Sequence, residues 1–178
     1  MKHPFSGLPE QTYSVLFKRI LPFTLVITAV MIALDTQLKN SEFAPLGILS
    51  LQFAQTPEAV QTLFSRWTGT SQVVLHFSLG LDYLYMVTYA LAISLGCVLG
   101  GIKHPRFQRW AHVLAWLLIV AACLDAIENA ACIAAIISGP TELTTAITYR
   151  FAGSKFFIIG LGLIFVIWAK LTPAKKQI

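Results

Sequence analysis

Two carboxylates and an amide lie close together inside one of the most apolar stretches of the sequence. The run from Trp116 to Ile137 contains Asp125, Glu128 and Asn129 among residues that are nearly all apolar. Charged side chains are costly to place in lipid, so in such a stretch they usually face the interior of a helix bundle and mark a functional site. A protonated Glu128 or Asp125 at this position is suited to donate a proton to an alkene or to a leaving group.

A second polar stripe occupies the apolar stretch that precedes this one. In both stripes the residues are spaced i, i+3, i+4 and i+7, so the members of each stripe share one face of a helix. The stripes are Asp82, Tyr85, Met86 and Tyr89 in the earlier stretch, and Asp125, Glu128, Asn129 and Cys132 in the later one. Since consecutive membrane helices run antiparallel, we expect the two faces to meet. Asp82 would then stabilise a developing positive charge, and Tyr85 and Tyr89 would offer ring faces that attract cations.

Three further ionisable residues are expected near these stripes. Asp35 lies at the end of the first apolar stretch, and Arg150 and Lys155 lie early in the last. At 1.5 Å of rise per residue they can meet the acids between mid-membrane and the outer surface. Acids outnumber bases in this group, so we expect one carboxylate to be protonated or to take a cationic ligand. The predicted catalytic residues are Asp82, Asp125 and Glu128, and the predicted ligand-binding residues are Asp35, Tyr85, Tyr89, Asn129, Arg150 and Lys155.

These side chains favour an intramembrane pocket that binds or chemically transforms a lipid or another hydrophobic small molecule. Two alternatives stay open. In a structural or assembly subunit, Glu128 or Asp125 would pair with Arg150 or Lys155 and only lock the bundle. In a proton- or cation-coupled transporter the acids would carry the ion, and so few spans would require a homodimer or a larger assembly. Whether any reaction is catalysed is also open at this point.

The composition places the polar stripes in a membrane protein. The chain has 178 residues, of which 56% are hydrophobic and 12% charged, whereas a soluble domain has about 25% charged residues. Four apolar stretches, residues 20–38, 72–100, 110–137 and 146–169, are long enough to cross a hydrocarbon core about 30 Å thick. Helices satisfy their backbone groups internally, so we expect one all-α domain over residues 1–178, a bundle of four transmembrane helices.

The basic residues predict the orientation of this bundle. Nine of the thirteen Lys and Arg residues lie before the first stretch, between the second and third, or after the fourth. The positive-inside rule assigns these regions to the cytoplasm, so both termini are expected there. The membrane would then be the bacterial inner membrane, and residues 39–69 would form a long outer loop.

The outer loop contains its own helix signal. Thr56-Pro57-Glu58 combines a hydroxyl N-cap, a proline at the first helical position and an acid, which predicts an amphipathic helix over residues 57–67. The alternation over residues 49–53 is typical of a strand, but no partner strand is evident, so we expect an interfacial segment or a loop insertion. Residues 9–17 are expected to form a second interfacial helix.

Several other kinds of site are disfavoured. The basic residues lie at the ends of apolar stretches, which indicates membrane anchoring rather than nucleic-acid binding. The three cysteines form no Cys-x-x-Cys pair, which argues against redox or zinc chemistry. His76 and His112 lie at opposite ends of their stretches, so a shared haem is disfavoured, and no cofactor or metal is expected. Gly96-x-x-x-Gly100 permits a close helix contact, either between copies of the chain or within one.

The segments that carry these features also resemble known proteins. Three segments are similar to a group of small four-span bacterial membrane proteins, and this resemblance implies no function. The segments are Leu81-Asp82-Tyr83 through Tyr89-Ala90, Leu124-Asp125 through Glu128-Asn129, and Thr56-Pro57-Glu58 through Trp67. More remotely, the layout resembles the emopamil-binding and sigma-2 receptor superfamily, whose four- or five-span bundles hold intramembrane acids around a sterol or amine-drug pocket. Asp35, Asp82 and the helical outer loop are similar in kind, whereas Asp125 and Glu128 have no counterpart there. This resemblance implies an apolar ligand with a cationic centre.

Overall fold

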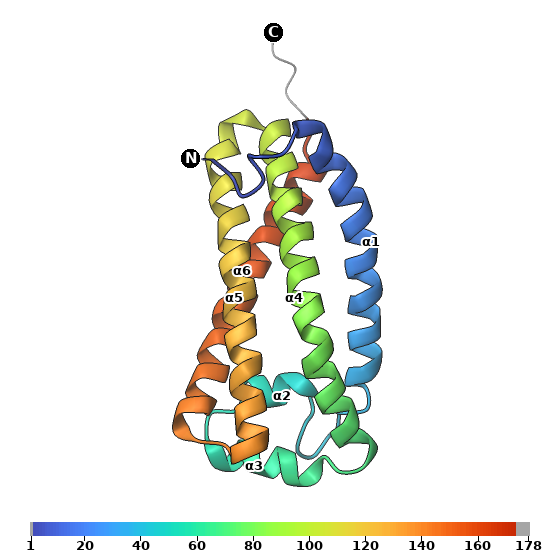
Figure 1. Cartoon of the computed structure of the whole chain (residues 1–178), viewed down its shortest axis with the longest axis vertical. Coiled ribbons are helices and arrows are strands. Elements are labelled where there is room, and N and C mark those ends of the chain that lie inside the picture. Colours follow the sequence, from blue (N-terminus) through green and yellow to red (C-terminus); the bar gives the residue numbers. More distant parts are fainter. Residues whose placement is uncertain (1, 174–178) are drawn as a thin grey trace. The chain divides into compact units, whose positions relative to one another are not determined.

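The computed structural model describes residues 2–173, and their regular structure is helical apart from one isolated bridge between Asn40 and Ala44. Figure 1 labels the helices, which are α1 (Glu10–Asp35), α2 (Ile48–Gln52), α3 (Pro57–Arg66), α4 (Thr70–Lys103), the short 3-10 turn η1 (Pro105–Phe107), α5 (Gln108–Ser138) and α6 (Glu142–Leu171). Helices α1, α4, α5 and α6 are long and apolar enough to cross a membrane. The expected all-helical architecture is therefore confirmed, and it fits an integral membrane protein.

Two segments differ from the sequence expectation. Residues 10–17 are helical, but they continue without a break into the first span as part of α1. No glycine or proline separates them from the span, so nothing ends the helix there. Residues 48–52 form the short helix α2 rather than an extended segment, with Leu51 and Gln52 buried. The following helix α3 begins at Pro57, directly after Thr56, whose hydroxyl accepts a hydrogen bond from the Ala59 N–H at 3.2 Å.

The chain divides into two compact units. The first, here called the termini unit, comprises Met1–Thr24, Val87–Cys123 and Lys155–Ile178. The second, here called the loop unit, comprises Leu25–Met86 and Leu124–Ser154. Each of the four long helices contributes residues to both units.

Small residues bring α4 and α6 together in the termini unit. A Cβ added at Gly100 would lie 2.9 Å from the Cβ of Ala169, and one added at Gly96 would lie 2.9 Å from a methyl group of Val166. Leu95 and Val98, on the same helix, are fully buried. The Gly96-x-x-x-Gly100 pattern therefore serves a helix contact within the chain, which is the intrachain use that such patterns allow.

The loop unit has an apolar core that includes its two short helices. Figure 1 shows α2 and α3 near the ends of the long helices in this unit. Val60 and Leu63 of α3 are buried in the same cluster as Leu75 and Leu79 of α4. Trp67, only 3% exposed, closes this core and donates from Nε1 to the Leu38 carbonyl oxygen at 2.9 Å. The long connection between α1 and α4 is thus packed onto the unit rather than left in solvent.

Candidate functional site

An amide–carboxylate pair joins α4 to α5 inside the loop unit. The side-chain nitrogen Nδ2 of Asn129 donates a hydrogen bond to Oδ2 of Asp82 at 2.8 Å. Asn129 is completely buried, and Asp82 is 8% exposed. The two polar stripes therefore do face each other at this point, as their helical phase predicts.

Two more carboxyl groups lie on the same face of α5. Asp125 is 2% exposed and Glu128 is completely buried. They precede Asn129 by four residues and by one residue, so Asp125 and Asn129 lie one helical turn apart. A carboxyl group removed from water is costly unless it has a proton, a partner or a ligand. This concentration of buried acid groups on α4 and α5 makes the loop unit the chemically richer of the two units.

Four buried polar atoms in the loop unit have no hydrogen-bond partner among residues 2–173. They are Oε1 of Gln52, Oγ of Ser78, Oδ1 of Asn129 and Oγ1 of Thr145. Most buried polar atoms in proteins are hydrogen-bonded, so a group of such atoms requires an explanation. Ser78 precedes Asp82 by one helical turn, which places its hydroxyl on the face of α4 that meets Asn129.

Other polar groups of the loop unit are bonded to each other. The Thr28 hydroxyl of α1 donates to the Tyr85 hydroxyl of α4 at 3.2 Å. Thr148 of α6 lies 3.7 Å from the Cys132 sulfur of α5 and donates to the Thr144 carbonyl oxygen at 3.0 Å. All four long helices therefore place hydroxyl, thiol, amide or carboxyl groups inside this unit.

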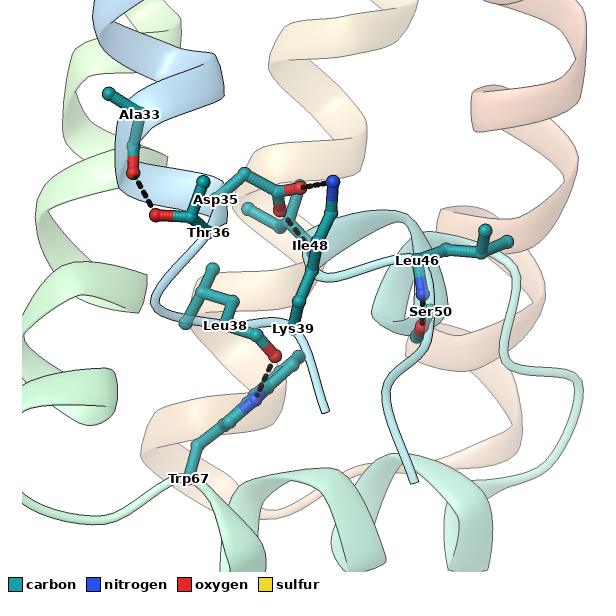
Figure 2. A network of polar contacts seen from close by, with 9 residues as sticks. All are labelled: Ala33, Asp35, Thr36, Leu38, Lys39, Leu46, Ile48, Ser50 and Trp67. Carbon is teal, nitrogen blue, oxygen red and sulfur yellow. Dashed lines mark hydrogen bonds and ion pairs between the residues drawn. The ribbon is translucent and has the colours of Figure 1, made fainter. Parts of the chain in front are cut away.

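Asp35 contacts the long connection between α1 and α4. Figure 2 shows its carboxylate between the backbone of α2 and the side chain of Lys39. Oδ1 accepts a hydrogen bond from the Ile48 N–H at 2.7 Å, and Oδ2 lies 3.5 Å from Nζ of Lys39. These contacts give Asp35 a structural role at the start of the loop.

The remaining predicted residues are distributed more widely. Arg150 has an exposed side chain, although it belongs to the loop unit. Tyr89 and Lys155 belong to the termini unit, where they are 4% and 3% exposed. Lys155 Nζ lies 5.2 Å from the centroid of the Phe156 ring. Within the loop unit, the predicted residues that are buried are thus Asp82, Asp125, Glu128 and Asn129, with Tyr85 half-buried.

Comparisons of the chain with protein-family models, with curated proteins and with solved structures found no match. Function is therefore inferred from the side chains and their geometry. Among residues 2–173, no group of three or more His, Cys, Asp or Glu side chains is placed to hold a metal ion.

Four buried polar residues of the loop unit are not among the predicted site residues. They are Gln52, Ser78, Thr145 and Thr148, all of which are at most 5% exposed. Thr145 and Thr148 are spaced i, i+3 on α6, which is a weak stripe signal. Because threonine hydroxyls commonly bond to their own helix backbone, as Thr148 does, such a signal is hard to separate from local bonding. Gln52 ends the short helix α2, in the connection between α1 and α4, and the sequence does not indicate the path of this connection.

Proposed function

We propose that the buried polar face of the loop unit binds a hydrophobic small molecule or lipid through a polar group of that molecule. The observation that carries this proposal is the state of Asn129. Its Nδ2 donates to Asp82, while its Oδ1 is buried and accepts no hydrogen bond within residues 2–173. Leaving a buried acceptor unsatisfied costs about 1–3 kcal/mol, so a ligand that donates to Asn129 would recover this energy.

The chemistry of the face restricts the ligand. The Asn129 oxygen accepts, the Asp82 carboxylate accepts, and the Ser78 hydroxyl can donate or accept. A ligand hydroxyl or ammonium group supplies the donors that this face needs. Apolar side chains precede and follow it along α4, where Leu75, Leu79 and Met86 are buried. An apolar molecule with a single hydroxyl or cationic head matches both properties.

A catalytic version assigns roles to the acids of α5. Glu128 or Asp125 would donate a proton to an alkene or a leaving group, and Asp82 would stabilise the positive charge that develops. In that case Glu128→Gln abolishes turnover or binding while the protein stays folded. Normal function in a folded Glu128→Gln protein would contradict these roles.

We also propose that the termini unit faces the cytoplasm and that the protein lies in a bacterial inner membrane. Between residues 2 and 173, the termini unit holds eight Lys and Arg residues and a single acid, Glu10. The loop unit holds three Lys and Arg residues and seven acids. This asymmetry supports the orientation given by the positive-inside rule. The short helix α3 would then lie on the outer side, with its buried face on the loop unit.

One observation favours the scaffolding alternative. The bond between Asn129 and Asp82 joins α4 to α5 directly, so part of the polar face would stabilise the bundle even without a ligand. The binding site and the scaffold differ in whether they need the hydroxyl group of Ser78. A scaffold does not need a buried hydroxyl that has no hydrogen-bond partner within residues 2–173, whereas a ligand site can use one.

The test is native mass spectrometry of the gently purified protein, with identification of any retained small molecule. Wild type is compared with Ser78→Ala, Asp82→Asn and the control Ser94→Ala. Ser94 is a buried serine of the termini unit whose Oγ donates to the Ala115 carbonyl oxygen at 2.9 Å. We expect Ser94→Ala to lower stability by about 1 kcal/mol and to keep the ligand. Ser78→Ala should keep or raise stability and lose the ligand.

The outcomes separate the two functions. A small molecule that is retained by wild type and by Ser94→Ala, but not by Ser78→Ala or Asp82→Asn, supports the binding site. A wild-type protein that retains no small molecule, together with an Asp82→Asn variant that no longer folds, overturns it and favours the scaffold.

A further inference from the structure

The termini unit has an apolar groove between α5 and α6. Its volume is about 610 Å³, and it is lined by Phe107 of η1 and by residues of both helices, including Trp110, Leu117, Leu161, Ile164 and Trp168. Several of these side chains are open to the surroundings, since Trp110 is 65% and Ile164 67% exposed. Helices α5 and α6 are both long and apolar enough to cross a membrane, and in a membrane this groove would face lipid.

A basic cleft adjoins this groove. Its volume is about 530 Å³, and Lys103, His104 and Arg106 line it together with Phe107 and Trp168. Phe107 and Trp168 line both the cleft and the groove. The Trp168 ring forms the shared wall, with its centroid 5.0 Å from that of Phe107 and 5.0 Å from that of His104. The aromatic groove therefore ends in a positively charged cleft.

The basic side chains of the cleft differ in how many hydrogen-bond donors they have left for a ligand. Lys103 Nζ donates to the carbonyl oxygens of Ala169 and Lys170 at 2.9 and 3.2 Å, which leaves one of its three protons. Nε2 of His104 lies 3.2 Å from the Ala169 oxygen. The exposed Arg106 side chain forms no hydrogen bond or ion pair within the part of the chain that the structure describes. Its full set of donors is therefore available to an anion.

We propose that the groove and the cleft together bind one anionic phospholipid. The phosphate would lie at Arg106 and Lys103, and an acyl chain would follow the groove between α5 and α6. The evidence is charge complementarity: a guanidinium with a free set of donors matches a phosphate, and it lies at the mouth of a groove whose lining is apolar. Basic pockets beside membrane helices on the cytoplasmic side bind anionic lipid head groups in this way. The proposal concerns the termini unit and does not depend on the binding site proposed for the loop unit.

The test is lipid titration of the full-length, detergent-purified protein, followed by native mass spectrometry. The probes are phosphatidylglycerol and phosphatidylcholine with the same acyl chains. Arg106→Gln is compared with Arg19→Gln, which removes an exposed arginine of the same unit that does not line the cleft. We expect wild type to retain phosphatidylglycerol more strongly than phosphatidylcholine. Arg106→Gln should weaken phosphatidylglycerol binding about fivefold, and Arg19→Gln should leave it unchanged.

A second pair of variants tests the groove. Trp110→Ala should weaken binding of both lipids, because the acyl chain loses an aromatic wall. Phe23→Ala, which truncates a half-exposed aromatic residue of α1 in the same unit, should weaken neither. Water-soluble glycerol phosphate is added in a separate titration, and it should not be retained, since the acyl chain is required.

Four results would overturn the proposal. These are equal retention of the two lipids by wild type, equal losses in Arg106→Gln and Arg19→Gln, unchanged binding in Trp110→Ala, and retention of glycerol phosphate as strong as that of the lipid. Circular dichroism of each variant confirms that it is folded before its lipid binding is compared.

Discussion

The carboxylate of Asp35 and the backbone N–H of Ile48, thirteen residues apart, are joined by a hydrogen bond of 2.7 Å. Between them the chain turns at Gly47, whose φ is +60°. A Cβ at Gly47 would overlap the Asp35 carboxylate. Asp35 therefore fixes the path of the loop from α1 to α2, and only glycine fits beside it (Figure 2).

Gly47→Ala should destabilise the loop unit. The positive φ alone costs about 1–3 kcal/mol for a residue with a side chain, and the new methyl group also displaces Asp35 from Ile48. The control is Gly69→Ala, because Gly69 has a φ of +58° but open space around its Cβ position. Thermal unfolding in detergent should rank Gly47→Ala clearly below Gly69→Ala. Equal losses in both variants would show that the contact with Asp35 contributes nothing.

Trp67→Phe should lower stability by about 1–3 kcal/mol. It removes the Nε1 donor and leaves the carbonyl oxygen of Leu38, a residue only 1% exposed, without its hydrogen bond. Trp116→Phe is the matched change, since Nε1 of Trp116 donates to the Lys2 carbonyl oxygen at 3.0 Å from a side chain that is 43% exposed. Because Lys2 is exposed and precedes the first span, water can replace the bond to its carbonyl oxygen, and the control should lose less than about 1 kcal/mol. Denaturant titration of the two variants checks the difference, and a control as unstable as Trp67→Phe would contradict it.

Gly100→Ala should weaken the contact between α4 and α6. The added Cβ would lie 2.9 Å from Ala169 Cβ, an atom that cannot rotate away, so the helices must separate at a cost of about 1–3 kcal/mol. Gly160→Ala, on α6, has nothing within 4 Å of the added Cβ. It should be neutral or stabilise the helix by up to about 1 kcal/mol. Melting temperatures in the same detergent measure both effects, and a Gly100→Ala protein as stable as wild type would show that the helices are not in tight contact.

Stability should also fall on acidification because of His3. Its ring lies 4.9 Å from that of His112 and 5.2 Å from that of Tyr13. Burial, and secondly the charge of His112, hold the pKa of His3 below its ordinary value of 6.5. The unfolded chain therefore binds more protons at this residue, so the stability is fully present above pH 6.5 and is lost as the pH falls through the lower, folded pKa.

Melting temperatures at about pH 7.5 and about pH 5.5, on either side of the ordinary histidine pKa, measure this effect. The difference between the two temperatures should shrink in His3→Gln. It should stay unchanged in His76→Gln, because His76 is exposed on the loop unit. An unchanged difference in His3→Gln would assign the pH dependence to other groups.

The helices and the meeting of the two stripes could be predicted from the sequence for clear physical reasons. Apolar runs longer than the hydrocarbon core leave a helix as the only structure that satisfies the backbone. The hydrogen bond between Asp82 and Asn129 follows from helical phase and antiparallel order, which require no knowledge of the loops. Thr56 predicts the start of α3, because a capping hydroxyl accepts a hydrogen bond from a backbone N–H within the first turn of the helix.

The path of the loops could not be predicted in the same way. The depth of Asp35 in its apolar stretch predicts that it lies near the other acids. Its hydrogen bond with the Ile48 N–H depends instead on the turn at Gly47, which the sequence does not indicate. The short helix α2 shows the same problem, since five residues are too few for a helical period to separate from an alternating one. Gln52 is buried for the same tertiary reason, so no local pattern marks it.

The four buried polar atoms of Gln52, Ser78, Asn129 and Thr145 that lack partners within residues 2–173 have an evolutionary consequence. At Ser78 and Thr145, an apolar residue of similar size should raise the melting temperature, because it removes a buried hydroxyl whose oxygen has no hydrogen-bond partner within residues 2–173. Proteins keep such costs where function requires them. Laboratory selection of random variants for heat resistance alone should therefore replace Ser78 and Thr145, and selection in the living cell should restore the polar residue at whichever of these positions the natural activity needs.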